Sequence, residues 1–466
     1  MARIVVIGAG MSGLAAAARL ATVGHRVTVC EATGTYGGLV GRYEREGFAF
    51  DTGPTLLTLP AVYRDLALKT GREPLEQLVE LTPVDPESRH VFADGTELVL
   101  PNASRGGVGK ALDAAFGAGS GEAWGEVMNR GRAVWEATRR PLLEEPLPAD
   151  PTPLHTDPYP VPAPRGLARL RRRRAHWTLA DVAATELRGR PGLGELLYEY
   201  AMRFGLDPRE APAGATVLPY MEQSFGVWYV GGGIRALADA VYRRCEQRGV
   251  EFRLGTRVDE VLTGHGRVTG VLAGGERIEA DAVLTAEPAE DAPAPAARAG
   301  RLSVFLALRG ARPAGTPHRT VVHAADQGTE WDELFTDGAL PGRPTVQVLR
   351  PGDPALAPDG HEAVTLTVTV PARVDAALLD SYTDRLLDHV AGAGCDVRQR
   401  LLWRETRTWG AVPAPALAGA GGAFLSAPNR SPVAGLYRIG AAAHPGGGLA
   451  RVGMSAAVTA GLIGPA

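Results

Sequence analysis

Three glycines near the start of the chain have the spacing of a dinucleotide-binding turn. The run RIVVIGAGMSGL places Gly8, Gly10 and Gly13 between an apolar, β-branched stretch and a run of helix-forming residues. In such a turn the first glycine permits a sharp bend, the second lets the backbone approach a pyrophosphate, and the third lets the helix pack closely on the strand. The start of the helix then offers N–H groups and its positive dipole end to phosphate oxygens. The chemistry expected here is therefore cofactor binding.

A carboxylate about 20 residues further on has the position that binds the ribose of such a cofactor. The alternation of Val27 and Val29 in RVTVCE predicts a second strand, which ends at Glu31. A carboxylate accepts hydrogen bonds from ribose hydroxyls and repels a 2′-phosphate, so NADP is disfavoured. The alternative interpretation is a secretory signal peptide, because Arg3 precedes an apolar, alanine-rich run. The glycine spacing, the second strand and Glu31 together favour the cofactor turn.

Two further glycine-rich segments could approach a long cofactor. Gly37 and Gly38 follow Glu31 closely, and a plain nicotinamide site does not require such a pair. Gly53 and Pro54, in FAFDTGP, predict a sharp turn after a short strand. Ordinary surface loops are the alternative interpretation of both segments.

The C-terminal region repeats the order of strand, glycine-rich turn and helix. Leu436–Ile439 predicts a short strand, and a helix of small residues follows the turn HPGGG. A helix N-terminus of this kind can face the N1 and O2 edge of a flavin, where charge accumulates on reduction. A turn without a ligand is the alternative. His444 is the candidate catalytic residue, as a group that stabilises or relays charge, and its alternative role is to fix the turn.

Length and composition limit the class of protein. The chain has 466 residues, enough for two domains or one large domain with an insertion. No uninterrupted apolar run is long enough to span a bilayer, and the net charge of −3 gives no reason to expect nucleic-acid binding. The three cysteines form no CxxC pair, which disfavours thiol–disulfide chemistry. We expect a cytoplasmic protein without a metal site.

The elements that position these residues predict an α/β fold. We expect a Rossmann-like, discontinuous cofactor domain into which a mixed-sheet and helical substrate domain is inserted. The expected segments are 1–80, 216–286 and 411–466 for the cofactor domain, and 81–215 and 287–410 for the substrate domain. Asp94-Gly95 and Gly274-Gly275 predict two hairpins. PTVQVLR and EAVTLTVTVP predict strands of the inserted domain.

A proline-rich segment leads into a strongly basic one. The prolines between Pro141 and Pro164 are expected to exclude helix and central strand. The following stretch, Arg165–Arg174, is interpreted as a solvated helix face. The sharper hypothesis is peripheral contact with an anionic membrane surface. Flotation with liposomes that contain or lack anionic lipid would distinguish the two.

Taken together, five segments resemble the carotenoid-type desaturases, the phytoene desaturase family of flavoproteins. They are GAGMSGL, EATGTYGGL, GFAFDTGPTLLTLP, VWYVGGG and RIGAAAHPGGGLARV. The resemblance covers both ends of the chain closely and the middle at intervals. It implies a flavin-containing amine oxidase-like fold with FAD bound lengthwise. It also implies removal of a hydride and a proton from adjacent carbons of an apolar, isoprenoid- or polyene-like substrate, with oxygen or a quinone as electron acceptor.

The resemblance also assigns positions along the cofactor. The pyrophosphate would be held by Gly8, Gly10, Ser12 and Gly13, and the adenosine by Glu31 and the backbone of Val258. The flavin half would be approached by Gly38, Leu39, Gly440, Ala441, Leu449 and Val452. The expected cofactor-binding set is completed by Met11, Ala32, Gly37, Gly53, Pro54 and Thr55. Trp228 and Tyr229 would help to wall the substrate side.

Several positions depart from the pattern of the family. Leu39 stands where the family commonly has arginine, for which Arg42 would substitute in part. Ala450 and Arg451 stand where the family has proline and glycine. An arginine so near the flavin would alter substrate preference or reach a polar group of the substrate. These departures leave FAD expected and weaken the expectation that phytoene itself is the substrate.

Rival functions share this fold or its motifs. Amine oxidases resemble one another in a lysine in the second half of the chain, whereas no lysine follows Lys110 here. Aromatic hydroxylases lack the glycine pair. Escort proteins for prenylated GTPases use the fold without flavin, and a yellow colour would distinguish an enzyme from such a binding module. An FAD-dependent oxidase, dehydrogenase or isomerase that acts on another secondary metabolite remains the alternative function.

Overall fold

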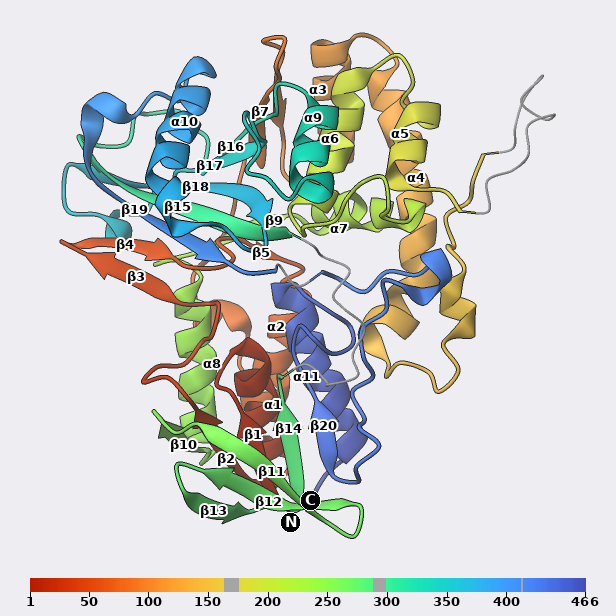
Figure 1. Cartoon of the computed structure of the whole chain (residues 1–466), viewed down its shortest axis with the longest axis vertical. Helices are drawn as coiled ribbons and strands as arrows, with labels where there is room; N and C mark the ends of the chain where they lie inside the picture. The colour runs from red at the N-terminus through yellow and green to blue at the C-terminus, as the bar shows by residue number, and fades with distance from the viewer. Residues whose placement is uncertain (163–175, 288–298, 412–413) are drawn as a thin grey trace.

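A computed structural model describes residues 1–162, 176–287, 299–411 and 414–466 of the chain. The lower part of the molecule in Figure 1 contains both termini, and the upper part contains a large sheet beside a group of helices. The basic stretch Arg165–Arg174 lies outside the described residues. Within the described ranges, no helix combines the length and the apolar character needed to cross a membrane.

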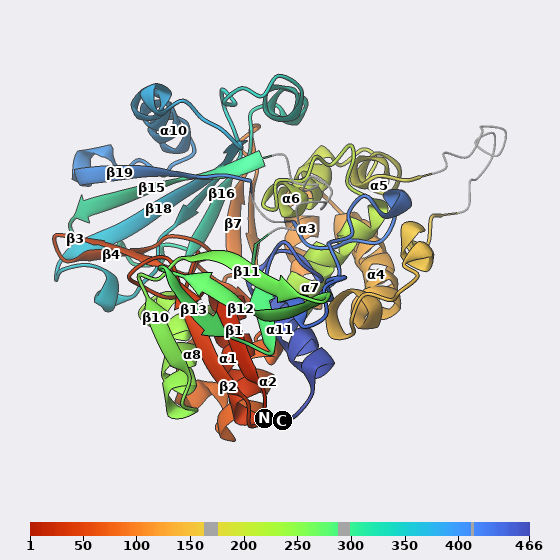
Figure 2. The same cartoon turned by 60° about the horizontal axis from the view of Figure 1, so that its bottom comes forward.

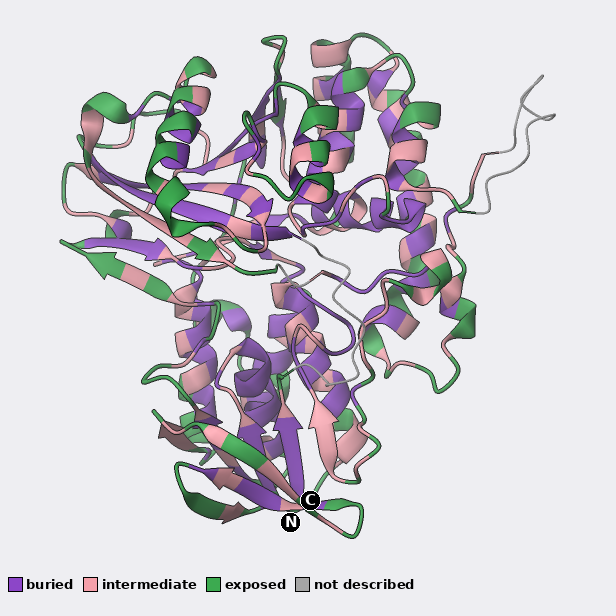
Figure 3. Cartoon of the chain, viewed as in Figure 1, coloured by how far each residue is buried: buried purple, intermediate pink, exposed green. Residues whose placement is uncertain are grey.

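A parallel sheet forms the centre of the lower part. In sheet order its strands are β10 (Glu251–Leu254), β2 (Arg26–Glu31), β1 (Arg3–Ile7), β14 (Ala282–Thr285) and β20 (Leu436–Arg438). The strands come from segments that are far apart in the sequence, as expected for a discontinuous domain. β1 and β14 are largely buried because both faces of the sheet are covered (Figure 3).

Helices cover one face of this sheet and a small antiparallel sheet covers the other. Ile4 and Val6 face the helices α1 (Met11–Thr22), α2 (Ala61–Gly71), α8 (Arg235–Gln247) and α11 (Leu449–Ile463). Val5 points the opposite way and packs on β12 (Arg267–Ala273), which pairs with β11 (Val258–Gly264) and β13 (Glu276–Glu279). The alternation follows from the two-residue period of a strand. The N-terminal run interpreted alternatively as a signal peptide thus supplies the central strand and helix of this core.

The two ends of the chain meet in this part of the molecule. The N–H of Ala466 donates to the carbonyl of Val23 at 3.1 Å, and Nε2 of His25 lies 3.0 Å from the carbonyl oxygen of Gly464. Both views place the two termini side by side (Figures 1 and 2). The glycine-rich turns at the two ends of the sequence therefore belong to one sheet.

The upper part contains a larger mixed sheet. In order its strands are β19 (Leu401–Trp409), β15 (Ala299–Arg309), β18 (His361–Pro371), β17 (Val346–Leu349), β16 (Arg319–Val322), β7 (Ser88–Val91) and β8 (Glu97–Leu100). Helix α10 (Leu379–Gly392) packs on one face through Tyr382, Leu386 and Leu387. The hairpin of β3 (Arg42–Arg45) and β4 (Phe48–Asp51) packs against Phe305 of this sheet.

A helical group lies beside the mixed sheet. It comprises α3 (Arg105–Phe116), α4 (Ser120–Arg139), α5 (Leu179–Glu186), α6 (Pro191–Met202) and α7 (Val217–Phe225), and the short α9 (Gln327–Trp331) lies nearby. Trp124, Leu112 and Leu196 are fully or almost fully buried in its core. A small sheet of β5 (Leu57–Thr58), β9 (Val227–Val230) and β6 (Leu81–Pro83) connects the lower and upper parts.

A buried ionic network joins the mixed sheet to the helical group. Arg319 of β16 pairs with Glu87 and with Glu222 of α7, and Arg203 pairs with Glu222 and with Glu199 of α6. Burial raises the pKa of Glu87, although Arg319 opposes the shift. Burial alone would also raise the pKa of Glu222, but Arg203 and Arg319 lower it. The network therefore places two guanidinium groups among buried carboxyl groups at the junction of sheet and helices.

The predicted α/β architecture and its hairpins are confirmed. Asp94-Gly95 closes the hairpin β7–β8, and Gly274-Gly275 closes β12–β13. The domain boundaries stay predictions. The expectation of no helix between Pro141 and Pro164 is wrong at two short turns, a π-helical turn at Arg140–Glu144 and a 3-10 turn at Thr152–His155. In the turn Thr152–His155 a proline is tolerated because it occupies the first positions, where its missing N–H would have no helical partner. The turn at Arg140–Glu144 continues α4 directly, and Pro141 lies where the helix changes to π-type hydrogen bonding.

Candidate cofactor and substrate site

The first glycine turn has the local geometry expected from its spacing. Gly8 has a φ of +96°, and a Cβ added to Gly13 would overlap the carbonyl oxygen of Gly8. Gly10 is the N-cap of α1, no side chain caps the helix, and its first turn contains no acidic residue. The first turn of α1 therefore contains no carboxylate of its own that would compete for the N–H groups of Met11, Ser12 and Gly13. This end of α1 is suited to an anion such as a pyrophosphate.

The glycine pair lies directly against this turn. The N–H of Gly37 donates to the carbonyl of Ala9 at 2.8 Å, and Gly10 and Gly37 form a parallel bridge. A Cβ added to Gly38 would lie 3.1 Å from the Cα of Gly10. The two glycine segments thus expose a strip of backbone without side chains. A side chain at these positions would occupy the space next to that strip.

Glu31 stands at the end of β2 beside the same turn. Its Oε2 accepts a hydrogen bond from the N–H of Ala9 at 2.8 Å, and its Oε1 accepts from the N–H and the hydroxyl of Thr33, both at 2.8 Å. These bonds fix the carboxylate while leaving lone pairs for other donors. The N–H of Thr256 donates to the carbonyl of Glu31, which brings the segment leading to Val258 beside the ribose position.

The C-terminal glycine turn lies against the start of α1. A Cβ added to Gly440 would lie 2.9 Å from Oγ of Ser12, and the N–H of Gly440 donates to Oγ of Ser455 at 3.1 Å. Helix α11 begins at Leu449 after the N-cap Gly448, again without a side-chain cap. Two uncapped helix N-termini therefore lie at the carboxyl edge of one parallel sheet, where ligands of open α/β sheets bind.

The segment around Leu39 and Gly53 extends the strip of backbone. A Cβ added to Gly53 would overlap the carbonyl oxygen of Leu39, and the Leu39 side chain is 54% exposed. Pro54 and Thr55 follow and are half-buried. Arg42, expected to replace a family arginine in part, donates to the carbonyl of Gly232 at 3.2 Å and pairs with Glu44. Its contacts are thus with protein groups.

His444 is held inside the C-terminal turn. The ring is fully buried, and its Nε2 lies 3.0 Å from the carbonyl oxygen of Glu145. Because a carbonyl oxygen can only accept a hydrogen bond, Nε2 is the donor in this contact. Asn429 donates to the carbonyl of His444 at 2.9 Å. Burial lowers the pKa of His444 to about 4, although the bond to Glu145 favours the charged form, and Arg451 lowers it further. A neutral ring bonded to backbone favours a positioning role over proton relay.

Replacement of His444 tests which role it has. His444→Ala is expected to lower thermal stability, because it removes a buried hydrogen bond and leaves a cavity. Flavin reduction should fall far less than the roughly 100-fold or more that loss of a proton-transfer group causes. Rapid-mixing measurement of flavin bleaching gives the rate, and melting of the same preparation gives the stability. A loss of reduction rate above about 100-fold with unchanged stability would restore the catalytic role.

Trp228 and Tyr229 lie in β9 and point to opposite sides. The Trp228 ring packs under the guanidinium of Arg64, whereas the Tyr229 hydroxyl donates to Asp353 at 2.7 Å. Neighbouring residues of a strand face opposite ways. The two side chains therefore have different surroundings, and the expectation that they help to wall the substrate side stays a prediction.

A long groove runs along α11. It has a volume of about 1010 Å³ and lies between α2, α4, α7 and α11, with part of its wall from the turn that follows α4. Its apolar lining includes Leu59, Ala61, Val62, Trp135, Leu143, Phe225, Met454, Ala457, Val458 and Leu462. Charged side chains also line it, and they form pairs with one another, among them Arg19 with Asp65 at 2.7 Å and Arg132 with Glu136 at 2.7 Å. The groove is suited to an elongated apolar molecule.

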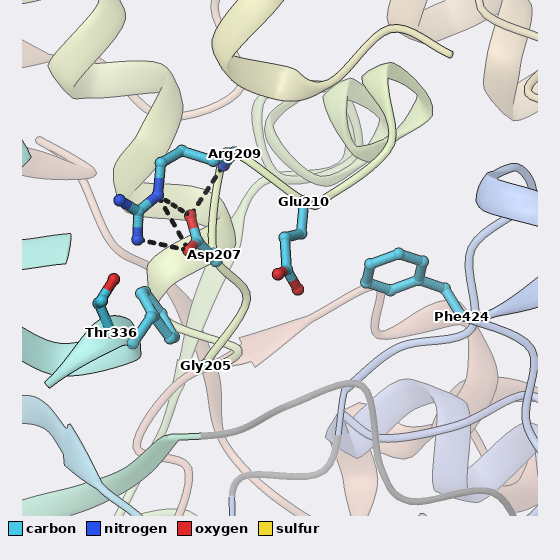
Figure 4. Close-up of a pocket in the computed structure, with 7 residues that line it drawn as sticks. Gly205, Asp207, Arg209, Glu210, Thr336 and Phe424 are labelled. Atoms are coloured by element: carbon cyan, nitrogen blue, oxygen red, sulfur yellow. Dashed lines mark hydrogen bonds and ion pairs between the residues drawn. The ribbon is translucent and has the colours of Figure 1, made fainter. Parts of the chain in front are cut away.

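A separate cavity of about 430 Å³ lies in the upper part of the molecule and is more polar. Figure 4 shows Asp207 and Arg209 facing each other across hydrogen bonds, with Glu210 and Phe424 on the other side. Arg209 also pairs with Asp332 at 2.6 Å. None of the residues predicted from the glycine motifs lines this cavity.

Comparison with known proteins identifies the family. The sequence model of the flavin containing amine oxidoreductase family matches residues 11–463. The chain is 31% identical to the zeta-carotene-forming phytoene desaturase of Myxococcus xanthus, over 79% of this chain and 72% of that protein. It is 29% identical to the hydroxyneurosporene desaturase of Rubrivivax gelatinosus, over 98% and 92% of the two chains. The chain belongs to the carotenoid-type desaturases of the flavin containing amine oxidoreductase family.

A structural comparison agrees with the predicted fold. An oxidoreductase from Methanosarcina mazei superposes with a TM-score of 0.62 at 16% identity, covering 98% of this chain and 99% of that one. At this identity the likeness shows the fold alone. The predicted fold class, a Rossmann-like flavin domain with an inserted mixed-sheet domain, is therefore confirmed, and the chain is an FAD-dependent oxidoreductase.

The residues present fit FAD. The bare strip at Gly10, Gly37 and Gly38, which a Cβ would fill, leaves room for a pyrophosphate close to the backbone, and Glu31 would hold the ribose. The first turn of α11 would face the flavin ring. Individual cofactor contacts stay predictions. Sequence reasoning missed the groove along α11 and the hydroxyl of Tyr63, which donates to the carbonyl of Leu449 at 2.9 Å. No local signal marks either, because their partners are distant in sequence.

Proposed function

We propose that this chain is an FAD-dependent desaturase or dehydrogenase that removes a hydride and a proton from adjacent carbons of an apolar, isoprenoid- or polyene-like substrate. FAD supplies the hydride acceptor when it is bound. Oxygen or a quinone would be the final electron acceptor. A cytoplasmic location with peripheral membrane contact through Arg165–Arg174 belongs to the same proposal.

The observation that carries the proposal is the groove along α11. Its apolar lining and its volume of about 1010 Å³ suit an extended hydrocarbon, and α11 is the helix whose first turn would face the flavin. The curated relatives whose names describe desaturases of phytoene and hydroxyneurosporene support a substrate of the same chemical class.

The side chains of the protein would bind the substrate, exclude water and fix the helix that faces the flavin. The apolar side chains of the groove hold the substrate and exclude water from the reacting carbons. Tyr63, through its bond to the carbonyl of Leu449, fixes the first turn of α11 against α2. Arrangement of the reacting carbons close to the hydride acceptor supplies most of the rate enhancement expected from such a site.

Amine oxidation receives no support from the lysines of the chain. Lys69 lies on α2 and pairs with Asp65 at 3.3 Å, and Lys110 lies on the exposed side of α3. Neither lies at the glycine turns, and no lysine follows Lys110 in the sequence.

Anaerobic reduction of the flavin tests the function. The FAD-loaded protein is mixed without oxygen with a panel that contains acyclic polyene hydrocarbons, primary amines and polar secondary metabolites. We expect the polyenes to bleach the flavin absorbance and to gain a double bond, and we expect the amines to leave it unchanged. Bleaching by an amine, with none by any polyene, would contradict the proposal. Readmission of oxygen or of a quinone then shows which one restores the flavin colour.

A further inference from the structure

The guanidinium of Arg451 is buried without a counter-charge. Arg451 lies in the first turn of α11 and is 8% exposed. Its recorded polar contact is a weak one, from Nη2 to Sδ of Met221 at 4.0 Å. Within the described ranges, no carboxylate pairs with it. Burial lowers the pKa of Arg451 to about 10, and no acidic group raises it again.

The other basic side chains nearby have acidic partners. Arg19 and Lys69 pair with Asp65, Arg132 pairs with Glu136, and Arg139 pairs with Glu144 at 3.3 Å. A buried charge without an opposite charge beside it is destabilising. Arg451 therefore differs from its neighbours by lacking the acidic group that would offset this cost.

Arg451 borders a small cavity beside the groove. The cavity has a volume of about 20 Å³, and its other walls are mainly aliphatic, including Leu142, Val217 and Leu417. A space of this size admits only a small polar group, such as the end of a longer molecule. Trp135, Arg139 and Leu143 line both this cavity and the groove along α11. A long molecule in the groove would thus need to extend only its end group past these side chains to reach Arg451.

We propose that Arg451 is a specificity-determining residue that binds a carboxylate at one end of the apolar substrate. The inference rests on the proposed function, because it assumes that the groove holds that substrate. A carboxylate would supply the missing counter-charge, and a guanidinium binds it through paired N–H donors. The preferred substrate would then be an isoprenoid or polyene acid rather than a pure hydrocarbon.

Binding of a matched pair of probes tests the inference. The probes are a C20 polyene carboxylic acid and its methyl ester, titrated into the FAD-loaded protein and followed by calorimetry and by the perturbation of the flavin spectrum. The wild-type chain should bind the acid about 10- to 100-fold more tightly than the ester. Arg451→Met should remove this preference and leave ester binding unchanged, whereas Arg451→Lys should retain part of it.

Arg244→Met is the matched control. It removes a guanidinium that is equally buried but is paired with Glu73 and lines neither the cavity nor the groove, and it should keep the preference for the acid. FAD content and melting temperature show that each variant is folded. Equal affinity for acid and ester in the wild type would overturn the inference. So would an Arg451→Met variant that loses FAD affinity while keeping the preference, because the charge would then serve the cofactor.

The flavin-bleaching test, carried out on the same preparation, distinguishes failure of this inference from failure of the proposed function. If neutral polyenes bleach the flavin but the protein binds the acid no more tightly than the ester, the proposed function stands and the role of Arg451 is refuted. If neither probe binds and no polyene bleaches the flavin, both proposals fail.

Discussion

Glu31→Ala is expected to yield a folded protein that is purified nearly free of FAD. The carboxylate accepts bonds from the N–H groups of Ala9 and Thr33, and it would also accept from the ribose hydroxyls. Hydrogen bonds to a charged group contribute about 1.5–3 kcal/mol each. Loss of the ribose bonds together with the disordering of the turn should raise the FAD dissociation constant by about 100-fold or more. Titration of the apoprotein with FAD, followed by flavin fluorescence, measures the change.

Glu251→Ala is the control for this substitution. Glu251 lies on β10, next to β2 in the same sheet, where it is exposed and pairs with Arg253 at 2.9 Å. Removal of this surface carboxylate should leave FAD affinity within about threefold of the wild type. Retention of normal FAD affinity in Glu31→Ala would show that the cofactor does not lie on the first glycine turn.

Gly13→Ala is expected to destabilise the protein by at least about 3 kcal/mol and to abolish FAD binding. The added methyl group would overlap the carbonyl oxygen of Gly8 and would also lie close to a side-chain carbon of Val6. Both groups belong to the buried turn between β1 and α1, so neither can move without displacing the helix from the sheet. Denaturant unfolding measures the stability, and the visible spectrum measures the cofactor content.

Gly34→Ala provides the comparison. Gly34 lies in the exposed loop between Glu31 and the glycine pair, and a Cβ added there meets no atom within 4 Å. The variant should unfold at the wild-type denaturant concentration and keep its FAD. If Gly13→Ala behaved in the same way as Gly34→Ala, the close packing of α1 on β1 would not support the cofactor turn.

The glycine turns of the candidate cofactor site could be predicted from the sequence because each of them has a local chemical reason. The spacing of Gly8, Gly10 and Gly13 requires a sharp turn and a close approach of helix to strand, and the structure contains both. The convergence of the two chain ends followed from two copies of one pattern, strand then glycine-rich turn then helix. Parallel strands place such turns at the same edge of a sheet.

The substrate side could not be predicted because it depends on side chains from distant segments. The groove is lined from α2, α4, α7 and α11, and no periodicity within one helix indicates which other helix it contacts. The absence of a carboxylate partner for Arg451 could likewise not be predicted, because such a partner can come from any segment of the chain.

The central claim is that the two ends of this chain hold one FAD between them. A crystal structure of the FAD-loaded protein tests this most directly. We expect the pyrophosphate at the turn of Gly10 and Gly13, the ribose at Glu31, and the isoalloxazine ring at the first turn of α11. A flavin located elsewhere, or a protein that stays colourless after incubation with FAD, would contradict the claim.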